Sequence, residues 1–378
     1  MGRFVVPLKK PKPNIEHWVK VIKGEIAPER PPMVEYLIDN AVMKPILTQM
    51  MGRKWVTTSE KEEYMGGQMD MSHESMEIIR GWLDNQIAFW YHMGYDFVRV
   101  EVSLPLPAQS RITRDTSDQA EDANRAWAET GTGPVRDWET YEKYPWPVVK
   151  DSDFFIHEHI TSHLPEGLGF ITCHAGGVFE HVCRLLGHEG MCYVLYDNPK
   201  LFQAVTDRLG KLIEEYNRRL IQLPNLYAIF QGEDMGFHSA TMISPASLKK
   251  YILPWHKKYA EMAHEKGLLY ILHNCGCVDS IMDDLIDYVK IDGKHSFEDV
   301  ITPIWEYKKR WGDKIALLGG VDVDKLVRYP TNKLRTYVRM IMDKCRKNGR
   351  FAIGAGNSIP SYIPVENYLT MCDAALRY

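Results

Sequence analysis

Short apolar runs that alternate with helical patterns dominate this sequence and limit the folds open to it. Several of the runs are continuously apolar, which is typical of strands buried on both faces of a parallel sheet. An alternation of strands and helices indicates an α/β protein, and eight strands are enough to close a barrel. The eight runs occupy residues 33–38, 97–102, 169–173, 226–230, 268–272, 288–291, 315–318 and 350–353.

The alternation therefore predicts an α/β fold, a (β/α)8 TIM-type barrel that spans residues 1–378 as a single domain. A chain of 378 residues is long enough for one such barrel. The helices between the runs are well marked, because residues suited to cap a helix or to begin one precede them. The clearest starts are Asn198-Pro199, Ser244-Pro245 and Thr331.

Residues 104–155 interrupt this alternation with a long stretch that is rich in Pro, Trp and Asp. A connection of that length inside a compact domain is usually a functional lid or a small subdomain. We therefore expect a long insertion after the second strand, lying over the mouth of the barrel at the carboxyl ends of the strands.

The charge balance argues against several classes of function. The 46 basic and 50 acidic residues give a net charge of −4 and are interspersed, so no nucleic-acid partner is indicated. No apolar run approaches the length of a membrane span, and the run at 4–8 is too short for a secretory signal. The seven cysteines are mostly scattered, which suits free thiols in the cytoplasm. The sequence predicts a cytoplasmic protein with no membrane partner.

Polar side chains suited to chemistry follow most of the runs. In an α/β barrel the active site forms where the strands pass into the following loops. Polar loops occur in any α/β protein, but carboxylates, a His-x-Cys pair and Gly-rich stretches together exceed what turns require. The candidates are Glu101 at the end of the second run, His174 after the third, Glu233 and Asp234 after the fourth, His273 and Cys275 after the fifth, His295 after the sixth, and Asn357 after the eighth.

His273 and Cys275 give the sharpest chemical signal. Residues two apart on a strand point to the same side, so the two side chains could hold one ion. Imidazole and thiolate together favour zinc. The alternative is a buried histidine beside an inert cysteine, but the position after a Leu-rich strand favours the metal. We interpret Cys277 as a packing residue, because Gly276 should end the strand first.

The adjacent carboxylates Glu233 and Asp234 give a second signal. Such a pair could bind metal or substrate, or each carboxylate could raise the pKa of the other. The alternative is an acidic pair at the N-terminus of a helix, where the helix dipole favours negative charge. Flanking glycines favour a functional role. His174, which precedes two glycines, could either cap a turn or hold a substrate anion.

In these stretches the chain resembles the uroporphyrinogen decarboxylase superfamily, from about residue 30 to the C-terminus. That superfamily contains decarboxylases of the haem pathway and methyltransferases that work with corrinoid proteins, and the resemblance implies a (β/α)8 barrel. The order of the motifs carries the resemblance more than any one of them. They are GEDMG, SPASLKKYILPWHKKY, LHNCG, HSFEDVI, IALLGGVD and GNSIPSYIPVENY.

The residues argue against the decarboxylase branch. Its members hold the substrate carboxylates with paired arginines near the N-terminus, whereas residues 33–39 contain no arginine. Glu101 and Ser103 stand where the decarboxylases carry an F-S-D motif, and Gly354-Ala355-Gly356-Asn357 replaces their G-H-G. A substrate with many carboxylates needs cationic partners, and this site offers carboxylates instead.

The resemblance is better to the corrinoid-dependent methyltransferases, which carry a zinc motif H-x-C…C. His273 and Cys275 match its first half, while Ala355 stands where the last cysteine would fall. A site with one thiolate fewer keeps more Lewis acidity, which suits cleavage of a methyl ether. The resemblance thus implies an O-demethylating methyltransferase that acts on a small methoxylated aromatic. Its methyl group would pass to cobalamin, a corrinoid carried by a partner protein, since the chain lacks an Asp-x-His-x-x-Gly motif.

These expectations assign a role to each candidate residue. Zinc would be bound by His273 and Cys275, with Glu233 or another strand-end group as a third ligand, and the Glu233–Asp234 pair would take part in catalysis. The substrate is held by Glu101, His174, His295 and Asn357. Two other functions stay open, a metal-free decarboxylase acting on a different carboxylic acid and a non-catalytic barrel that binds a ligand. A homodimer is also compatible with the sequence.

Overall fold

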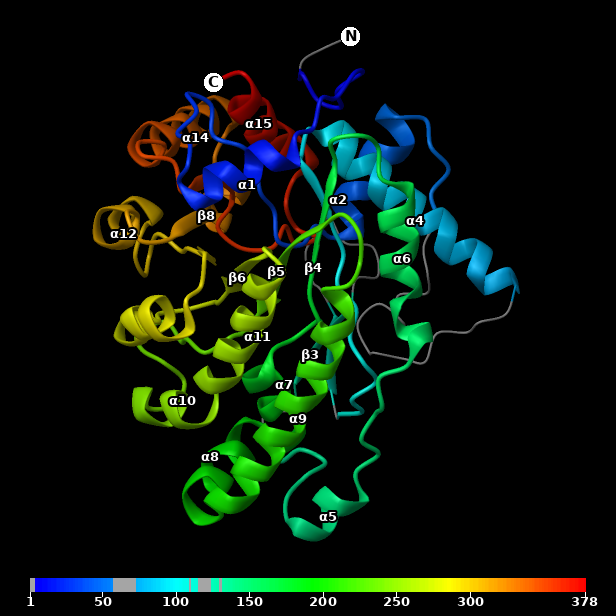
Figure 1. Cartoon of the computed structure of the whole chain (residues 1–378). Coiled ribbons are helices and arrows are strands. Elements are labelled where there is room, and N and C mark those ends of the chain that lie inside the picture. The colour runs from blue at the N-terminus through cyan, green and yellow to red at the C-terminus, as the bar shows by residue number, and fades with distance from the viewer. Residues whose placement is uncertain (1–3, 57–72, 109, 115–123, 129–130) are drawn as a thin grey trace.

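A parallel β-sheet that curls through the centre of the molecule organises the fold (Figure 1). The computed structural model describes residues 4–56, 73–108, 110–114, 124–128 and 131–378. Within these residues the sheet has seven strands in the order β1-β4-β5-β6-β7-β8-β9, and each strand pairs in parallel with the next. This is an α/β fold consistent with a TIM-type barrel. The strands are β1 (Phe97–Arg99), β4 (Gly169–Thr172), β5 (Leu226–Gly232), β6 (Leu269–His273), β7 (Gly293–His295), β8 (Ala316–Val321) and β9 (Phe351–Ala355).

Helices pack around the outside of this sheet (Figure 1). Near the N-terminus, the amide of Val5 donates to Oδ1 of Asp373 in the last helix (2.5 Å). The α-helices are α1 (Ile15–Lys23), α2 (Asn40–Pro45), α4 (His73–Met93), α5 (Trp138–Lys143), α6 (Phe155–His163), α7 (Val178–Leu186), α8 (His188–Asp197), α9 (Pro199–Leu220), α10 (Pro245–Tyr251), α11 (Leu253–Glu265), α12 (Ile304–Trp311), α13 (Val323–Arg328), α14 (Thr331–Cys345) and α15 (Val365–Leu376). Shorter turns of 3-10 or π helix are η1 (Ile46–Met50), η2 (Asp151–Phe154), η3 (Asp279–Ile281) and η4 (Asp284–Val289).

The helix starts expected from the sequence are confirmed. Asn198 caps α9 by accepting a hydrogen bond from the amide of Leu201, and Pro199 takes the first helical position. Ser244 caps α10 in the same way, through the amide of Ser247. These caps form because a short polar side chain satisfies an amide that has no partner within its own helix.

The first expected strand is only partly realised. Within 33–38 the chain forms isolated parallel bridges, Met33 with Ile353 and Ile38 with Ile359, instead of a continuous ladder. The preceding Pro32 has no amide hydrogen to donate, so the ladder cannot extend in that direction. The segment still lies beside β9, because the amide of Val34 donates to the carbonyl of Ile353.

The sixth expected strand was wrong in position. Residues 288–289 belong to the helical turn η4, and the strand is Gly293–His295, further along the chain. The turn ends at Lys290, which has a left-handed backbone (φ 66°). Val289 and Ile291 are buried as expected, but a short apolar run does not distinguish a strand from the buried end of a helix.

The long connection from β1 to β4 contains further elements. Two strands, β2 (Ser110–Arg114) and β3 (Asn124–Ala128), form an antiparallel pair, and α5 and η2 follow them. The amides of Gly133 and Val135 donate to carbonyls at the end of α7. Residues 109, 115–123 and 129–130 of the expected insertion lie outside the described residues, and its role as a lid stays a prediction.

The register of the central strands brings three strand ends level with one another. Gly232, the last residue of β5, pairs with His273, the last of β6, and His273 pairs with His295, the last of β7. The residues after β5 and β6 therefore leave the sheet at the same edge. Over the described part of the chain, no helix is long and apolar enough to cross a membrane.

Candidate metal centre

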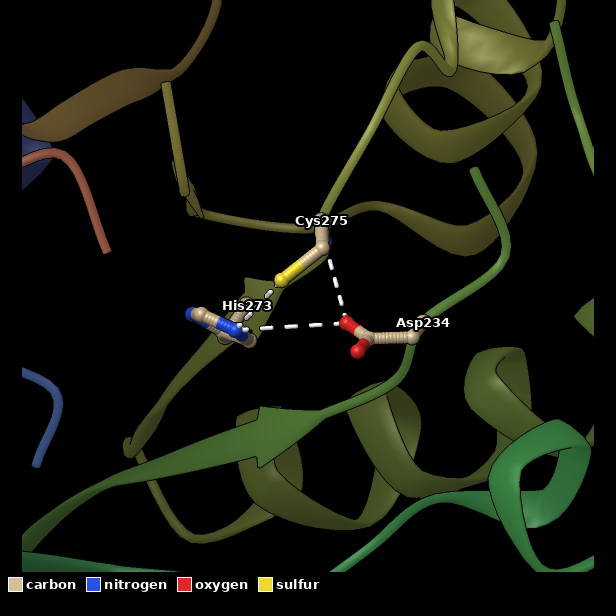
Figure 2. A group of neighbouring side chains, drawn as sticks. All are labelled: Asp234, His273 and Cys275. Atoms are coloured by element: carbon tan, nitrogen blue, oxygen red, sulfur yellow. Dashed lines mark hydrogen bonds and ion pairs between the residues drawn. The ribbon is translucent and has the colours of Figure 1, made fainter. Parts of the chain in front are cut away.

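Three possible metal donors meet at the carboxyl ends of β5 and β6. His273 is the last residue of β6, Cys275 follows two residues later, and Asp234 follows the end of β5. The Nε2 atom of His273 lies 3.3 Å from Cys275 Sγ and 4.0 Å from Asp234 Oδ1. Figure 2 shows the thiol and the carboxylate facing the same edge of the imidazole. All three donor atoms lie within 4.8 Å of one another, which is close enough for a single ion.

Two glycines bring the loops that carry these donors into close contact. A Cβ on Gly236 would lie 2.5 Å from the carbonyl oxygen of Cys275, and a Cβ on Gly276 would lie 2.4 Å from the carbonyl carbon of Gly236. Gly276 also has a left-handed backbone (φ 73°). The amide of Cys277 donates to the carbonyl of Phe237 (2.7 Å), which fastens the two loops together. Cys277 thus links the loops through its backbone and is not one of the three grouped donors.

Burial sets the protonation of the three groups. It lowers the pKa of His273 well below its usual value, with smaller contributions from His295 and Arg99. Burial raises the pKa of the Cys275 thiol well above its usual value, and the neighbouring Asp234 raises it further. Partial burial also raises the pKa of Asp234, whose side chain is 45% exposed. A neutral imidazole, a thiol that can lose its proton and a carboxylate fit zinc by their donor chemistry.

Glu233 does not lie with these donors, although we expected it as a ligand. One of its oxygens accepts from the amide of Phe179 (3.0 Å) and from Nε2 of His256 (2.9 Å), and the other accepts from the amide of Glu180 (2.9 Å). The carboxyl is fully buried at the N-terminus of α7. Successive residues leave a strand on opposite sides, so Asp234 instead of Glu233 faces His273.

The structure places Glu101 and His174 away from the three donors. Glu101 accepts hydrogen bonds from Arg99 (2.7 Å) and from the hydroxyl of Tyr36 (3.2 Å). His174 is fully buried, and its Nε2 accepts from the amide of Leu104 (3.1 Å) while Nδ1 lies 3.2 Å from the carbonyl oxygen of Gly176. Both of its ring nitrogens thus contact the backbone, which matches the alternative in which His174 caps a turn.

Asn357 and His295 do lie at the centre. The side-chain amide of Asn357 donates to Cys275 Sγ (3.3 Å), and its oxygen accepts from the amide of Ser358. His295 contacts His273 through the Nδ1 atoms of both rings (2.7 Å). The two residues therefore contact the donors themselves, which leaves their expected contact with substrate a prediction.

The sequence analysis missed two residues that support the centre. The ring of Tyr36 stacks on His273 with centroids 3.8 Å apart and an interplanar angle of 11°. The guanidinium of the buried Arg99 lies 3.8 Å from the centroid of the same tyrosine ring. Both residues lie within strand-like runs whose ends alone were searched. A polar side chain inside an apolar run was the sequence feature that could have identified both residues.

Glu180 is a third residue that the sequence did not indicate. It lies in the first turn of α7, and its carboxylate accepts from the amide of Gly177 (3.2 Å). Burial raises its pKa well above the usual value, and the charges of Asp234 and Glu233 raise it further. Glu180 interacts with Asp234 and Glu233 because the fold brings α7 beside the end of β5, and this proximity cannot be deduced from the sequence.

Comparisons with known proteins identify the family and support the fold. The family model described as uroporphyrinogen decarboxylase matches residues 134–378. Among solved structures, a methyltransferase from Methanosarcina mazei superposes with a TM-score of 0.67, over 97% of this chain and 99% of that one. The two sequences are 15% identical, so this likeness shows the fold alone. No curated protein matches the chain.

Proposed function

Because the chain belongs to the uroporphyrinogen decarboxylase family, we propose that it is a methyltransferase of the corrinoid-dependent branch of that family. It would move the methyl group of a small methoxylated aromatic to the Co(I) corrinoid of a partner protein. The observation that carries this proposal is the group of Asp234, His273 and Cys275, whose three donors fit a zinc ion. The metal-free decarboxylase remains the second candidate.

The donor set favours ether cleavage over activation of a thiol. Asp234, His273 and Cys275 supply one thiolate, and Ala355 has no side-chain donor at the position of the family's last cysteine. A zinc ion bound here with an open position would polarise the ether oxygen of the substrate, where negative charge develops as the methyl group leaves. Asn357 would hold the sulfur of Cys275 in place through its N–H.

The surroundings of the centre do not suit a porphyrinogen. Arg99, whose charge acts on His273, is fully buried, and its guanidinium is paired with Glu101 (2.7 Å). Asp234, Glu180 and Glu298 interact electrostatically around the centre, as their raised pKa values reflect, and burial is the largest cause for each. Carboxylates of this kind would repel a polyanionic substrate.

The partner is proposed from the position of the centre. The ends of β5 and β6 open at the face where the corrinoid would have to approach, because methyl transfer needs donor, carbon and acceptor nearly in line. Two exposed apolar side chains, Phe237 and Val300, lie on the loops after β5 and β7 and offer contact surface there. A thiol that must stay reduced also suits the cytoplasm.

We further propose that residues 33–38 complete the sheet as its eighth strand and close a (β/α)8 barrel. On one side this segment bridges to β9. On the other side Tyr36 stacks against Arg99 of β1 and donates to Glu101. Between residues 33–38 and β1, the contacts are thus made by side chains and not by a backbone ladder.

The test combines metal analysis with turnover. Zinc content is measured in the purified protein, and a panel of methoxyarenes is then offered with Co(I) cobalamin while the cobalamin spectrum is followed. Cys275→Ala should lose both zinc and turnover. The matched control Cys277→Ala should keep both, since Cys277 lies outside the donor group. A metal-free protein that releases carbon dioxide from a carboxylic acid would replace our proposal with the decarboxylase.

A further inference from the structure

His295 lies behind His273, on the side of the ring opposite to Cys275. The contact joins the Nδ1 atoms of the two imidazoles (2.7 Å), whereas the Nε2 atom of His273 faces the thiol (3.3 Å). The Nε2 atom of His295 in turn lies 3.1 Å from the carbonyl oxygen of Ala355. Two histidines and one carbonyl thus form a single chain of contacts that ends at the candidate metal centre.

The carbonyl of Ala355 fixes the direction of the hydrogen bonds between these groups. A carbonyl oxygen can only accept, so Nε2 of His295 must carry a hydrogen. A neutral imidazole has one N–H, which leaves Nδ1 of His295 as an acceptor. The short contact then requires the hydrogen to be on Nδ1 of His273, so its Nε2 carries the lone pair.

Both rings are neutral in this arrangement. His295 is fully buried and His273 is only 5% exposed, and burial away from water disfavours the charged form of an imidazole. The cations Lys294 and Arg99 act in the same direction on both histidines.

We propose that His295 is a positioning residue, which fixes the Nδ1–H tautomer of His273 and so reserves Nε2 as a ligand for the metal. This inference deepens the proposed function and rests on it for the identity of the ligand. It changes the role of His295 from the substrate contact expected from the sequence to support of a metal ligand. Support of this kind orients a metal-bound histidine and makes its other nitrogen more basic.

Packing holds the chain of contacts in place. Gly319 has a left-handed backbone (φ 99°), and a Cβ there would lie 3.0 Å from the ring of His295 and 2.3 Å from the carbonyl oxygen of Ala355. The amide of Gly356, which shares a peptide with the carbonyl of Ala355, donates to the carbonyl of Val321 (2.6 Å) and so fixes that peptide. Ala355, which lacks the family's last thiol, thus contributes through its backbone.

The tautomer can be measured without metal. Long-range 1H–15N correlation spectra of the metal-free protein with 15N-labelled histidine distinguish a protonated ring nitrogen from an unprotonated one. His273→Gln removes one set of signals and so assigns it. We expect the Nδ1 atom of His273 to be protonated and its Nε2 atom to be unprotonated. Protonation at Nε2 would overturn the proposal.

Metal affinity supplies the second test. His295→Phe removes the acceptor, and zinc should bind about 10- to 100-fold more weakly. His295→Gln keeps an acceptor for Nδ1 of His273 and a donor for Ala355, and it should recover most of the affinity. Unchanged affinity in a folded His295→Phe protein would contradict the role. Failure of the wild-type protein to bind zinc would instead refute the metal centre. The tautomer spectrum would still show whether His295 fixes the tautomer of His273.

Discussion

At the scale of single residues, a metal ion at the candidate centre would release a proton as it binds. Burial and Asp234 keep the Cys275 thiol protonated in the metal-free protein, because its pKa lies well above the usual value. His273 is already neutral, since its pKa is lowered. A metal ion therefore has to displace a proton from sulfur but none from the imidazole.

We predict that zinc affinity rises with pH. The metal-bound state holds fewer protons than the free state, so acid must weaken binding and alkali must strengthen it. One proton released per ion corresponds to about a tenfold change in Kd per pH unit. Calorimetry in buffers of different ionisation enthalpy counts the protons directly. Affinity that stays constant between pH 6 and pH 8 would exclude the Cys275 thiol as a ligand.

The adjacent carboxylates of Glu233 and Asp234 have different roles, one in stability and one in metal binding, which gives a second prediction. Glu233→Gln removes a buried charge that accepts from two amides of α7 and from His256. Leaving these donors without their charged acceptor should lower the free energy of unfolding by about 3 kcal/mol, with little effect on zinc affinity. Asp234→Asn should weaken zinc binding and leave the free energy of unfolding nearly unchanged, because Asp234 is 45% exposed and lies in the donor group.

Urea denaturation and zinc titration of the same two variants separate the roles. Loss of zinc without loss of stability in Glu233→Gln would return the third ligand to Glu233, as the sequence first suggested. Loss of stability without loss of zinc in Asp234→Asn would remove Asp234 from the centre.

At the scale of the elements, the continuously apolar strands and the capped helices were predictable from sequence. The runs that became β4, β5 and β9 are located to within two residues, because burial on both faces leaves an unbroken apolar signal. β7 was misplaced, because Gly293, Lys294 and His295 carry no apolar signal even though all three are buried. Their burial depends on partners from other strands.

The candidate centre was predictable only where its residues are close in sequence. His273 and Cys275 share one strand end, so their spacing identified them. The choice of Asp234 over Glu233 depends on which side of β5 faces β6 and which faces α7, and sequence spacing does not contain that information. Tyr36 lies on a distant segment, and its stacking on His273 is a product of the closed fold.

At the scale of the whole molecule, buried histidines make stability depend on pH. His157 is fully buried, and burial lowers its pKa to about 3. Burial likewise lowers the pKa of His174 to about 4. The unfolded chain takes up protons at these groups near the ordinary value of about 6.5, whereas the folded chain does not. Stability is therefore complete above that value and falls as the pH decreases towards the lowered values.

His157→Phe tests this dependence. In the wild-type protein, His157 alone should cost about 2 kcal/mol of unfolding free energy between pH 7.5 and pH 5, at 1.36 kcal/mol per unit of pKa. Phenylalanine cannot titrate and would pack against the rings of Phe154, Phe170 and Tyr216 that surround this position. Urea denaturation at both pH values should show a smaller loss in the variant. An equal loss in the two proteins would mean that His157 is not the group responsible.

The pairing of residues 33–38 with β9 has a consequence for the synthesis of the protein. The carboxylate of Glu35 accepts from the amide of Ala355, 320 positions further along the chain. At about 5–20 residues per second, a ribosome needs roughly 16–64 s to make the residues between them. During that interval the nascent N-terminal segment has no β9 to pair with, while the strands from β1 onward can join the sheet as they emerge. The hydrogen bond from His295 to the carbonyl of Ala355 also cannot form until β9 has been made. The support that His295 gives to His273 would therefore be complete only after Ala355 has left the exit tunnel, although the three donors of the candidate centre emerge earlier.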